Sequence, residues 1–339
     1  MIVSGIQKLS KGESLSQSEI RQIFTQIMQG EATPAQIAAF ITALHIKGET
    51  IEEITAAALT MRGFAQPIKV NARIILDTCG TGGSGLQTFN VSTLVALIAA
   101  AAGITVAKHG NRSATSKAGS ADLLEKLGVN INAEPQTVEK CINQIGIGFL
   151  FAPKFHLAMK HAIGPRREIG IRTIFNILGP LTNPARATHQ LMGVCSGDLT
   201  AAICAVLANL GLVHALVVHS EQGMDEISTA SKTLIYELKN KQIKNYSISA
   251  EDFGIKQGKL ADLQISNVEQ SQAITIDILK GKTGPVYDLV VLNAGFALYT
   301  ADAVNDPKQG IELAKAVLAD GRVLEKLELL KKYSNEINT

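Results

Sequence analysis

The sequence lacks a strong net charge, a paired-cysteine motif and a hydrophobic run long enough to cross a membrane. Its formal net charge is only +2, which argues against a nucleic-acid or membrane partner recognised through overall charge. The four cysteines form no C-x-x-C pair, a pattern typical of buried, reduced thiols in the cytoplasm. The N-terminus has no basic-then-apolar signal, and the apolar run at residues 91–102 is too short to span a bilayer. These absences predict a cytoplasmic protein without a nucleic-acid or membrane partner.

The remaining composition is that of a large, glycine-rich globular protein. The 339 residues are 46% hydrophobic and include 29 glycines, enough for a large core and two domains. Residues 1–70 carry helix-start signals at Ser16, Thr33 and Thr50, each followed by apolar residues at helical spacing. From residue 72, short apolar strands alternate with helices, which predicts a mostly parallel sheet flanked by helices. The predicted fold class is α/β with a small N-terminal helical domain.

Two strand–loop–helix units between residues 74 and 122 are the strongest indication of function. Strands are expected at residues 74–77 and 104–107, each followed by a polar loop and the start of a helix. Both loops would lie at one edge of the sheet, where helix N-termini and backbone N–H groups attract anions. No Asp or Glu occurs between Asp77 and Asp122, whereas Lys108, Arg112 and Lys117 do. This charge pattern predicts an anionic ligand.

The first loop also matches a nucleotide-binding pattern in part. Gly80, Gly82 and Gly85 satisfy G-x-G-x-x-G between a strand and a helix. A dinucleotide site needs an acidic residue at the end of the second strand to bind the ribose hydroxyls, and this sequence has Lys108 and His109 there. NAD is therefore disfavoured and an NADP site stays open. A P-loop is excluded, because no Gly-Lys-Ser/Thr follows the glycines at the required spacing.

Two further segments indicate charged ligands. A helix expected to begin near Pro165 would place Arg166 in its first turn, where a cation opposes the helix dipole. A bound anion and a solvated arginine pair explain that position equally well. Asp225 and Glu226 follow a strand expected at residues 215–219. Adjacent carboxylates at the end of a strand, together with phosphate oxygens, suit Mg²⁺.

The other segments carry secondary-structure patterns only. We expect helices at residues 121–127 and 135–145 and a short buried strand at 149–152. A hairpin is expected at residues 233–248 and a strand at 287–293. An amphipathic helix at residues 311–330 should be interrupted near Gly321.

The motifs resemble those of the anthranilate phosphoribosyltransferases, which transfer phosphoribose in tryptophan biosynthesis. The family's G-T-G-G-D and T-F-N-[IV]-S-T patterns correspond to residues 80–84 and 88–93. Its K-H-G-N-R and S-x-x-G-S-A-D patterns correspond to residues 108–112 and 116–122. Further matches fall at residues 149–153, 159–161, 166–168, 170–184 and 223–228. The resemblance extends from the first helix to beyond Asn293, which is nearly the whole chain.

The resemblance implies that anthranilate reacts with 5-phosphoribosyl 1-diphosphate to give N-(5-phosphoribosyl)anthranilate and diphosphate. This is the second step of tryptophan synthesis from chorismate. It also implies a helical domain at residues 1–70, joined by part of 155–182, and an α/β domain at residues 71–339. A homodimer would form through the helical domains, and Mg²⁺, two ions per monomer, would bind with the substrates. Any anthranilate synthase subunits would be separate chains, because we expect no fused amidotransferase segment.

The family's functional residues carry over position by position. The implied catalytic residues are Lys108, His109 and Arg166. The implied anthranilate contacts are Gly80, Asn111 and Arg166, and the implied metal ligands are Ser92, Asp225 and Glu226. The implied phosphoribosyl diphosphate site comprises Gly80, Gly83, Ser84, Thr88, Asn90, Val91, Ser92, Thr93, Lys108, His109, Gly110, Asn111, Arg112, Ser113, Ala114, Thr115, Ser116 and Ser120. His109 is either a base for the amine proton or a loop histidine bonded to the backbone.

Three departures from the family pattern stand out. Ser84 replaces the usual Asp beside the diphosphate, Phe155 and Leu157 replace the commoner Tyr and Pro, and Pro165 is shifted by one place.

Two other functions fit the same architecture. A pyrimidine nucleoside phosphorylase would not need Mg²⁺, and a non-catalytic nucleic-acid-binding relative would need a coherent basic stripe.

Overall fold

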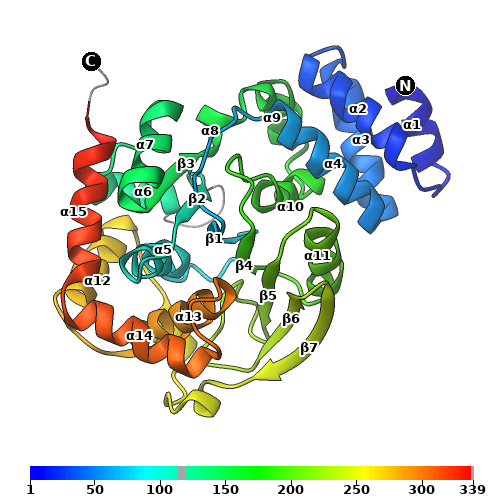
Figure 1. Ribbon diagram of the computed structural model, residues 1–339. Helices are drawn as coiled ribbons and strands as arrows, with labels where there is room; N and C mark the ends of the chain where they lie inside the picture. The colour runs from blue at the N-terminus through cyan, green and yellow to red at the C-terminus, as the bar shows by residue number, and fades with distance from the viewer. Residues whose placement is uncertain (114–118, 337–339) are drawn as a thin grey trace.

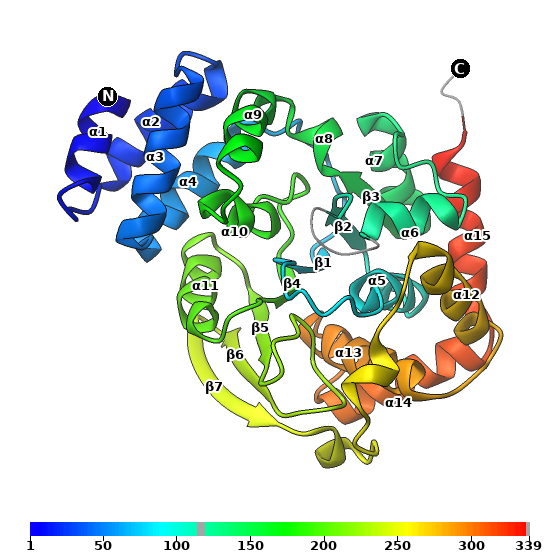
Figure 2. The same ribbon diagram turned by 180° about the vertical axis from the view of Figure 1, so that it is seen from behind.

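A computed structural model describes residues 1–113 and 119–336 (Figure 1). The chain forms a helical N-terminal part beside a larger part built on one mixed sheet, as both views show (Figures 1 and 2). The predicted fold class is confirmed. In the described ranges no helix is long and apolar enough to cross a membrane.

The N-terminal part is a helical bundle whose helix starts are fixed by side chains. Within residues 1–70 the helices are α1 (Ile2–Leu9), α2 (Gln17–Gln29), α3 (Pro34–Lys47) and α4 (Ile51–Phe64). Ser16, Thr33 and Thr50 each begin a reciprocal capping box, as predicted. Two helices from further along the chain, α9 (Lys160–Ile169) and α10 (Ile174–Leu181), pack against α3 and α4. The helical bundle therefore combines α1–α4 with α9 and α10, which share one hydrophobic core.

The larger part is organised by a sheet with the strand order β3-β2-β1-β4-β5-β6-β7 in the described ranges. The strands are β1 (Leu76–Gly80), β2 (Val106–Gly110), β3 (Ile147–Phe151), β4 (His189–Gly193), β5 (His214–Ser220), β6 (Thr233–Lys239) and β7 (Gln242–Ile248). The strands from β3 to β5 run parallel, and β6 and β7 form the predicted antiparallel hairpin. The parallel strands therefore all end at one edge of the sheet, which we call the carboxyl edge.

Helices cover both faces of the parallel part of the sheet, so strands β1 to β5 are buried on both sides, whereas the edge strand β7 is mostly exposed. The helices outside the bundle are α5 (Val91–Ala101), α6 (Ser120–Lys126), α7 (Pro135–Ile145), α8 (Ala152–Phe155), α11 (Asp198–Asn209), α12 (Val268–Leu279), α13 (Pro285–Thr300), α14 (Pro307–Ala319) and α15 (Arg322–Ser334). One face packs against α5 and α13, and α14 packs on the outside of these two helices in the same larger core. The opposite face packs against α11 and the helical bundle. This arrangement places the bundle next to the carboxyl edge.

Two strand predictions were wrong in ways that follow from packing. Residues 287–293, expected as a strand, lie inside α13, whose residues are buried on all sides from Leu289 to Thr300. An apolar run that is buried all round has no periodicity that separates helix from strand. β1 and β2 also extend to Gly80 and Gly110, because they pair in register with β4 and β3. Several residues expected in loops therefore lie in strands.

The prediction for the helix around Pro165 was also wrong. α9 begins at Lys160, and Pro165 lies inside it. Arg166 therefore lies in the last turn of the helix, where a cation is favoured by the helix dipole. The dipole argument for a bound anion near Arg166 consequently fails, and any such role must rest on other contacts.

Candidate functional site

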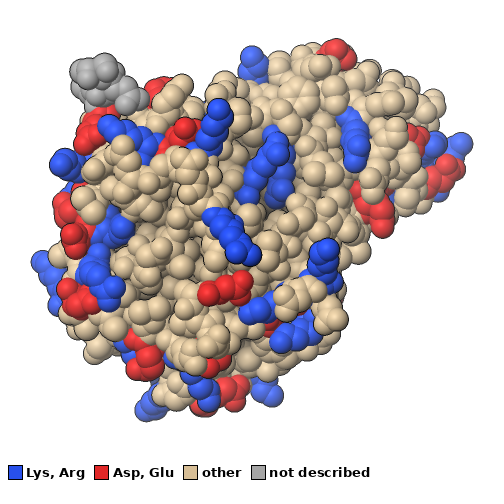
Figure 3. Space-filling view, viewed as in Figure 1, with Lys and Arg blue, Asp and Glu red and all other residues tan. Residues whose placement is uncertain are grey.

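The loops that follow β1, β2 and β5 meet at the carboxyl edge. Gly80 of β1 pairs with Gly193 of β4, and Gly110 of β2 pairs with Phe151 of β3, so these strands end level with one another. Most of the predicted site residues belong to these strand ends and loops. On the face drawn in Figure 3, Lys and Arg side chains gather in the centre, near α9 and α10. The fold thus brings the predicted residues to one place beside the helical bundle.

The loop after β1 is tied to the loop after β5. The Gly82 N–H donates to Asp225 Oδ2 at 2.9 Å, and the Thr81 N–H donates to the Gly193 carbonyl at 2.9 Å. Gly80 and Gly193 leave space for Asp225, because a Cβ at Gly80 would lie 2.5 Å from its Oδ2 and a Cβ at Gly193 would overlap its backbone. Glycine at these strand ends therefore allows the carboxylate to reach the loop.

The middle of this loop has a backbone that only glycine adopts easily. Gly82 and Gly83 have positive φ values of 63° and 80°. Ser84, in the place of the family's usual Asp, accepts a long hydrogen bond of 3.4 Å from the Leu86 N–H. The loop is therefore shaped by glycines and local turn contacts, and Ser84 adds no charge to it.

The start of α5 adjoins the glycine loop and is held by a distant segment. The Thr78 hydroxyl of β1 donates to the Ser92 carbonyl at 2.8 Å. Ser271 of α12 donates to Asn90 Oδ1 at 2.8 Å, and the Phe89 N–H donates to a carbonyl at residue 263. Residues 263–271 carry no recognisable motif, which is why sequence reasoning missed this support. The other predicted residues of the segment are Thr88, Val91 and Thr93.

Lys108 is a buried cation between these two segments. Its side chain is 3% exposed, and its ammonium donates to the Thr78 carbonyl at 2.7 Å and to Ser92 Oγ at 3.3 Å. Among the described residues no carboxylate forms an ion pair with it. Burial lowers the pKa of Lys108, and the nearby Asp77 opposes this shift. Burial raises the pKa of Asp77 to about 6, although Lys108 and Asn183 favour its charged form. The site therefore holds a positive charge that protein carboxylates match only at a distance.

His109 lies in β2 and not in a loop, facing a second buried histidine. Its backbone N–H donates to Asp77 Oδ1 at 3.2 Å, and its ring centroid lies 5.1 Å from that of His156. The Nε2 atoms of both rings are buried without a hydrogen-bond partner in the described part of the chain. Burial lowers the pKa of His109 well below its usual value and that of His156 to about 4. Both rings are therefore neutral at pH 7, and sequence reasoning did not select His156.

The arginine of the loop after β2 forms ion pairs with nearby acidic residues of the protein. Arg112 donates to both carboxylate oxygens of Glu125, at 2.8 and 2.9 Å, and to Asp122 at 2.8 Å. These acids lie at the end of the acid-free stretch and match the charge of Arg112. Ser120 donates to the Asn111 carbonyl at 3.3 Å. Gly110 also leaves room for the Ser120 hydroxyl.

The second loop is described up to Ser113. Ser113 donates its backbone N–H to Asp122 Oδ2 at 3.2 Å. The predicted residues Ala114, Thr115 and Ser116 lie outside the described residues, as does Lys117. The charge pattern that predicted an anion therefore depends chiefly on Lys108.

Two arginines come from the bundle side, and one of them, Arg172, contacts the glycine loop. The Arg166 guanidinium lies 5.1 Å from the centre of the Phe175 ring, and burial lowers its pKa. No described carboxylate forms an ion pair with Arg166. Arg172 was not selected by sequence reasoning, yet its Nη1 donates to the Gly82 carbonyl at 3.3 Å. Of the substituted channel residues, Phe155 is buried and Leu157 is 62% exposed.

Asp225 and Glu226 supply oxygen atoms that fit Mg²⁺. Burial raises the pKa of Asp225, and burial together with the Asp225 charge raises that of Glu226 well above its usual value. Two neighbouring carboxylates at partly buried positions repel each other unless a cation binds. Ser92 lies next to Glu226, and the donor set consists only of oxygen. Within the described ranges no group of three or more His, Cys, Asp and Glu could hold a metal.

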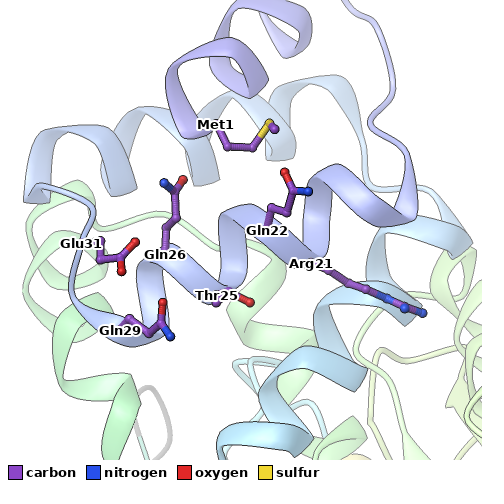
Figure 4. A pocket seen from close by; sticks show the side chains of 7 residues that line it. All are labelled: Met1, Arg21, Gln22, Thr25, Gln26, Gln29 and Glu31. Atoms are coloured by element: carbon purple, nitrogen blue, oxygen red, sulfur yellow. The ribbon is translucent and has the colours of Figure 1, made fainter.

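A separate pocket lies on the outer side of the helical bundle. Figure 4 shows its lining, which comes mostly from one face of α2. The lining residues are Met1, Arg21, Gln22, Thr25, Gln26, Gln29 and Glu31. None of them is a predicted site residue.

The arrangement of domains and site defines a class of protein. Residues 72–324 match the a/b domain of the glycosyl transferase family, and residues 3–65 match its helical bundle domain. The chain is 50% identical to the anthranilate phosphoribosyltransferase of Acetivibrio thermocellus over 99% of this chain and 97% of the relative. The chain belongs to the anthranilate phosphoribosyltransferases, enzymes of tryptophan biosynthesis.

Solved structures agree with that membership. The crystal structure of anthranilate phosphoribosyltransferase from Thermus thermophilus has a TM-score of 0.93 at 41% identity, covering 98% of this chain and 99% of that one. The Saccharomyces cerevisiae enzyme in complex with PRPP and Mg has a TM-score of 0.91 at 27% identity, covering 99% of this chain and 98% of that one. Another structure of the yeast enzyme contains 4-fluoroanthranilate, at 26% identity and a TM-score of 0.90, with 99% and 98% covered.

Proposed function

We propose that the residues gathered at the carboxyl edge perform the family's reaction by stabilising diphosphate as it leaves the ribose. The reaction transfers the phosphoribosyl group of 5-phosphoribosyl 1-diphosphate to the amine of anthranilate. The observation that carries this assignment is the position of Lys108, a buried cation without an ion-pair partner among the described residues, next to Ser92 at the start of α5. A diphosphate bound there would supply the missing negative charge.

The phosphoribosyl diphosphate would bind along the glycine loop, the start of α5 and the loop after β2. Backbone N–H groups of the glycine loop and the N-terminal end of the α5 dipole both favour a phosphate group. The proposed contacts are Gly80, Gly83, Ser84, Thr88, Asn90, Val91, Ser92, Thr93, Lys108, His109, Gly110, Asn111, Arg112, Ser113, Ala114, Thr115, Ser116 and Ser120. Arg112 would have to keep or exchange its contacts with Glu125, so we expect it to contribute less than Lys108.

Asp225, Glu226 and Ser92 would hold Mg²⁺, two ions per monomer. When bound, Mg²⁺ neutralises charge on the diphosphate and makes it a better leaving group. The carboxylates also position the glycine loop, because Asp225 accepts from the Gly82 N–H. These residues therefore link metal binding to the shape of the anion site.

Anthranilate would bind against the bundle side of the edge, at Gly80, Asn111 and Arg166. The Arg166 guanidinium stacks near Phe175 and has no matching carboxylate in the described part of the chain, so the substrate's carboxylate would complete an ion pair. The aromatic amine is already nucleophilic, and holding it in line with C1 of the ribose supplies much of the rate enhancement. His109 is neutral and buried, so it can accept a proton but is a weak base.

The protein would work as a cytoplasmic homodimer that associates through its helical domains. Separate anthranilate synthase subunits would produce its acceptor. The exposed residues Val3 and Ile46 of the helical bundle, 53% and 78% exposed, supply apolar surface for such an association.

Anthranilate fluorescence tests the function directly. The chain contains no Trp, so the protein background is low. The signal should decay only when protein, phosphoribosyl diphosphate and Mg²⁺ are all present, and EDTA should stop it.

Arg166→Ala should raise the KM for anthranilate at least about ten-fold through loss of a charge-assisted contact. Arg167→Ala, an exposed neighbour, is the matched control. Phosphorolysis of a nucleoside without Mg²⁺, or an unchanged anthranilate KM in Arg166→Ala, would contradict the proposal.

A further inference from the structure

Arg172 connects the helical bundle to the glycine loop. It directly precedes α10, a helix that packs against α3 and α4 of the bundle. Its Nη1 nevertheless donates to the carbonyl of Gly82 in the α/β domain, at 3.3 Å. Within the described residues no carboxylate forms an ion pair with Arg172. Its guanidinium therefore bonds to a backbone carbonyl, and its charge also acts on the nearby Asp225 without forming an ion pair.

The peptide groups of Gly82 are held from two sides. The Gly82 N–H donates to Asp225 Oδ2 at 2.9 Å, while the Gly82 carbonyl accepts from Arg172. Gly82 and Gly83 both have positive φ, so this part of the loop has little intrinsic preference for one shape. A Cβ at Gly83 would overlap the Arg172 guanidinium. The Thr81 hydroxyl also donates to the Gly82 carbonyl, at 3.3 Å. Contacts with Arg172, Asp225 and Thr81 therefore hold the loop in its conformation.

We propose that Arg172 is a positioning residue for the diphosphate group, acting through the glycine loop. The inference rests on the proposed function, in which Asp225 binds Mg²⁺ and the loop N–H groups meet the diphosphate. If Asp225 holds Mg²⁺, its carboxylate would be shared between the metal and the Gly82 N–H, which could then also donate to the diphosphate. Arg172 would then hold the loop together with Thr81, whose N–H donates to the Gly193 carbonyl and whose hydroxyl donates to the Gly82 carbonyl. Arg172 differs from Thr81 in that it ties the loop to the bundle that carries Arg166.

The choice of arginine fits this role. A guanidinium is planar and always charged, and it offers several N–H donors in a fixed geometry. It can hold the Gly82 carbonyl with one N–H group while other donors point to the anion site. A lysine at the same position would keep the charge, but its ammonium group sits on a flexible chain and lacks the fixed donor geometry of the guanidinium.

Steady-state kinetics of Arg172→Ala and Arg172→Lys test the proposal. For Arg172→Ala the KM for phosphoribosyl diphosphate should rise about ten-fold, the loss expected for one charge-assisted contact. The KM for anthranilate and the kcat should change less than two-fold, roughly the scatter of an independent site. Arg172→Lys should recover part of the loss. Arg167→Ala, exposed on α9, is the control and should match the wild type.

The outcomes separate this inference from the proposed function. If the wild-type protein does not consume anthranilate, the proposed function fails. If the wild type is active but Arg172→Ala leaves the KM for phosphoribosyl diphosphate unchanged, Arg172 is not a positioning residue. A rise confined to the anthranilate KM would place Arg172 in the acceptor site and overturn the proposal. Thermal unfolding of each variant shows whether the fold is retained.

A second variant tests the same contact without removing the charge. Gly83→Ala places a methyl group where the guanidinium lies and also strains a backbone with positive φ. It should raise the KM for phosphoribosyl diphosphate in the wild-type background. In the Arg172→Ala background the clash is absent, so the rise should be smaller and only the backbone strain should remain. Equal effects of Gly83→Ala in both backgrounds would show that the guanidinium does not position the loop.

Discussion

The two edges of the sheet differ in whether their buried charged groups have partners of opposite charge. At the carboxyl edge, neither Lys108 nor Arg166 has an ion-pair partner among the described residues, and Asp225 lies beside a second carboxylate. At the amino edge, where β4 and β5 begin, the carboxylates of Glu237 and Asp302 have hydrogen-bond partners within the protein, although His214 Nε2 has none among the described residues. The same sheet therefore carries an edge with unmatched charge and an edge with matched charge.

The matched edge is a network of five side chains, His189, His214, Glu237, Tyr299 and Asp302, which we call the amino-edge network. The rings of His189 and His214 lie 3.3 and 3.0 Å from the two carboxylate oxygens of Asp302. His214 also lies 3.5 Å from Glu237, and the Tyr299 hydroxyl donates to Glu237 at 2.7 Å. Each carboxylate thus has at least two partners. No residue of this network belongs to the proposed site.

The difference between the edges bears on folding stability and on ligand binding. In a buried network of paired charges, removing one group leaves its partners buried without hydrogen bonds, which destabilises the protein. An unmatched buried charge lowers stability and persists where a ligand supplies the opposite charge. We therefore expect substitutions at the two edges to change stability in opposite directions.

The largest effect on stability is expected for Glu237→Ala at the amino edge. Glu237 is 1% exposed, and it accepts from the hydroxyls of Tyr299 and Tyr246. Removing it should lower the free energy of unfolding by about 3 kcal/mol, because buried donors and His214 lose their partner. Urea denaturation at pH 7 measures the change. Glu251→Ala, an exposed matched control, should change it by less than about 0.5 kcal/mol.

The pH dependence of this effect follows from the pKa of Glu237. Burial alone would raise that pKa, but hydrogen bonds from His214, Tyr299 and Tyr246 outweigh burial and hold it at about 2. A depressed carboxylate pKa contributes stability above the unfolded value of 4.5, and the contribution is lost as the pH falls towards 2. The difference between wild type and Glu237→Ala should therefore shrink below pH 4.5. A difference that is the same at pH 7 and pH 3 would contradict this account.

A smaller effect is expected for His156 at the carboxyl edge, where burial lowers the pKa to about 4. An unfolded histidine binds its proton near pH 6.5, so the unfolded state gains protons first and stability falls as the pH drops below 6.5. Between pH 7 and pH 5 this loss should amount to about 2 kcal/mol. His156→Gln should lack this contribution to the slope of stability against pH. Asp77 titrates in both proteins, so the difference isolates His156.

The control for this measurement is His45→Gln, an exposed histidine of α3. As a substitution on the surface, it should change the free energy of unfolding at pH 7 by less than about 0.5 kcal/mol. If His156→Gln keeps the wild-type slope, the ring of His156 is not held neutral by burial. The contrast between the two edges would then have to rest on the carboxylates and not on the histidines.

Local signals predicted much of the fold. Capping boxes at Ser16, Thr33 and Thr50 depend on residues three positions apart, so the sequence reveals them. The strand–loop–helix units and the hairpin were predicted from short apolar patterns. The expected strand at 287–293 failed because α13 is buried all round, and a burial of that kind is set by neighbours distant in sequence.

The positions of the candidate site residues could be predicted where a sequence motif carried them, but not where they depend on a tertiary contact. Lys108, Asp225 and Glu226 lie together at the carboxyl edge, as the topology required. Arg172 reaches Gly82 across 90 residues, and Ser271 reaches its partner at the start of α5 across 181 residues. No local spacing encodes such contacts. The ion pair between Arg112 and Glu125 was missed for a different reason. Glu125 lies three residues beyond Asp122, where the acid-free stretch ends.

The smallest and most discriminating effect is expected for Glu226→Gln, which should stabilise the protein while impairing its Mg²⁺-dependent activity. Burial and the Asp225 charge raise the pKa of Glu226, so the ionised form costs stability at neutral pH. Removing that charge should raise the free energy of unfolding by about 1 kcal/mol. Because a raised carboxylate pKa matters only above the unfolded value of 4.5, the gain should be present at pH 7 and vanish near pH 4. Glu221→Gln, exposed in the same loop, is the control and should change neither quantity. A loss of stability in Glu226→Gln at pH 7 would mean that Glu226 is matched within the protein, and the two edges would no longer differ.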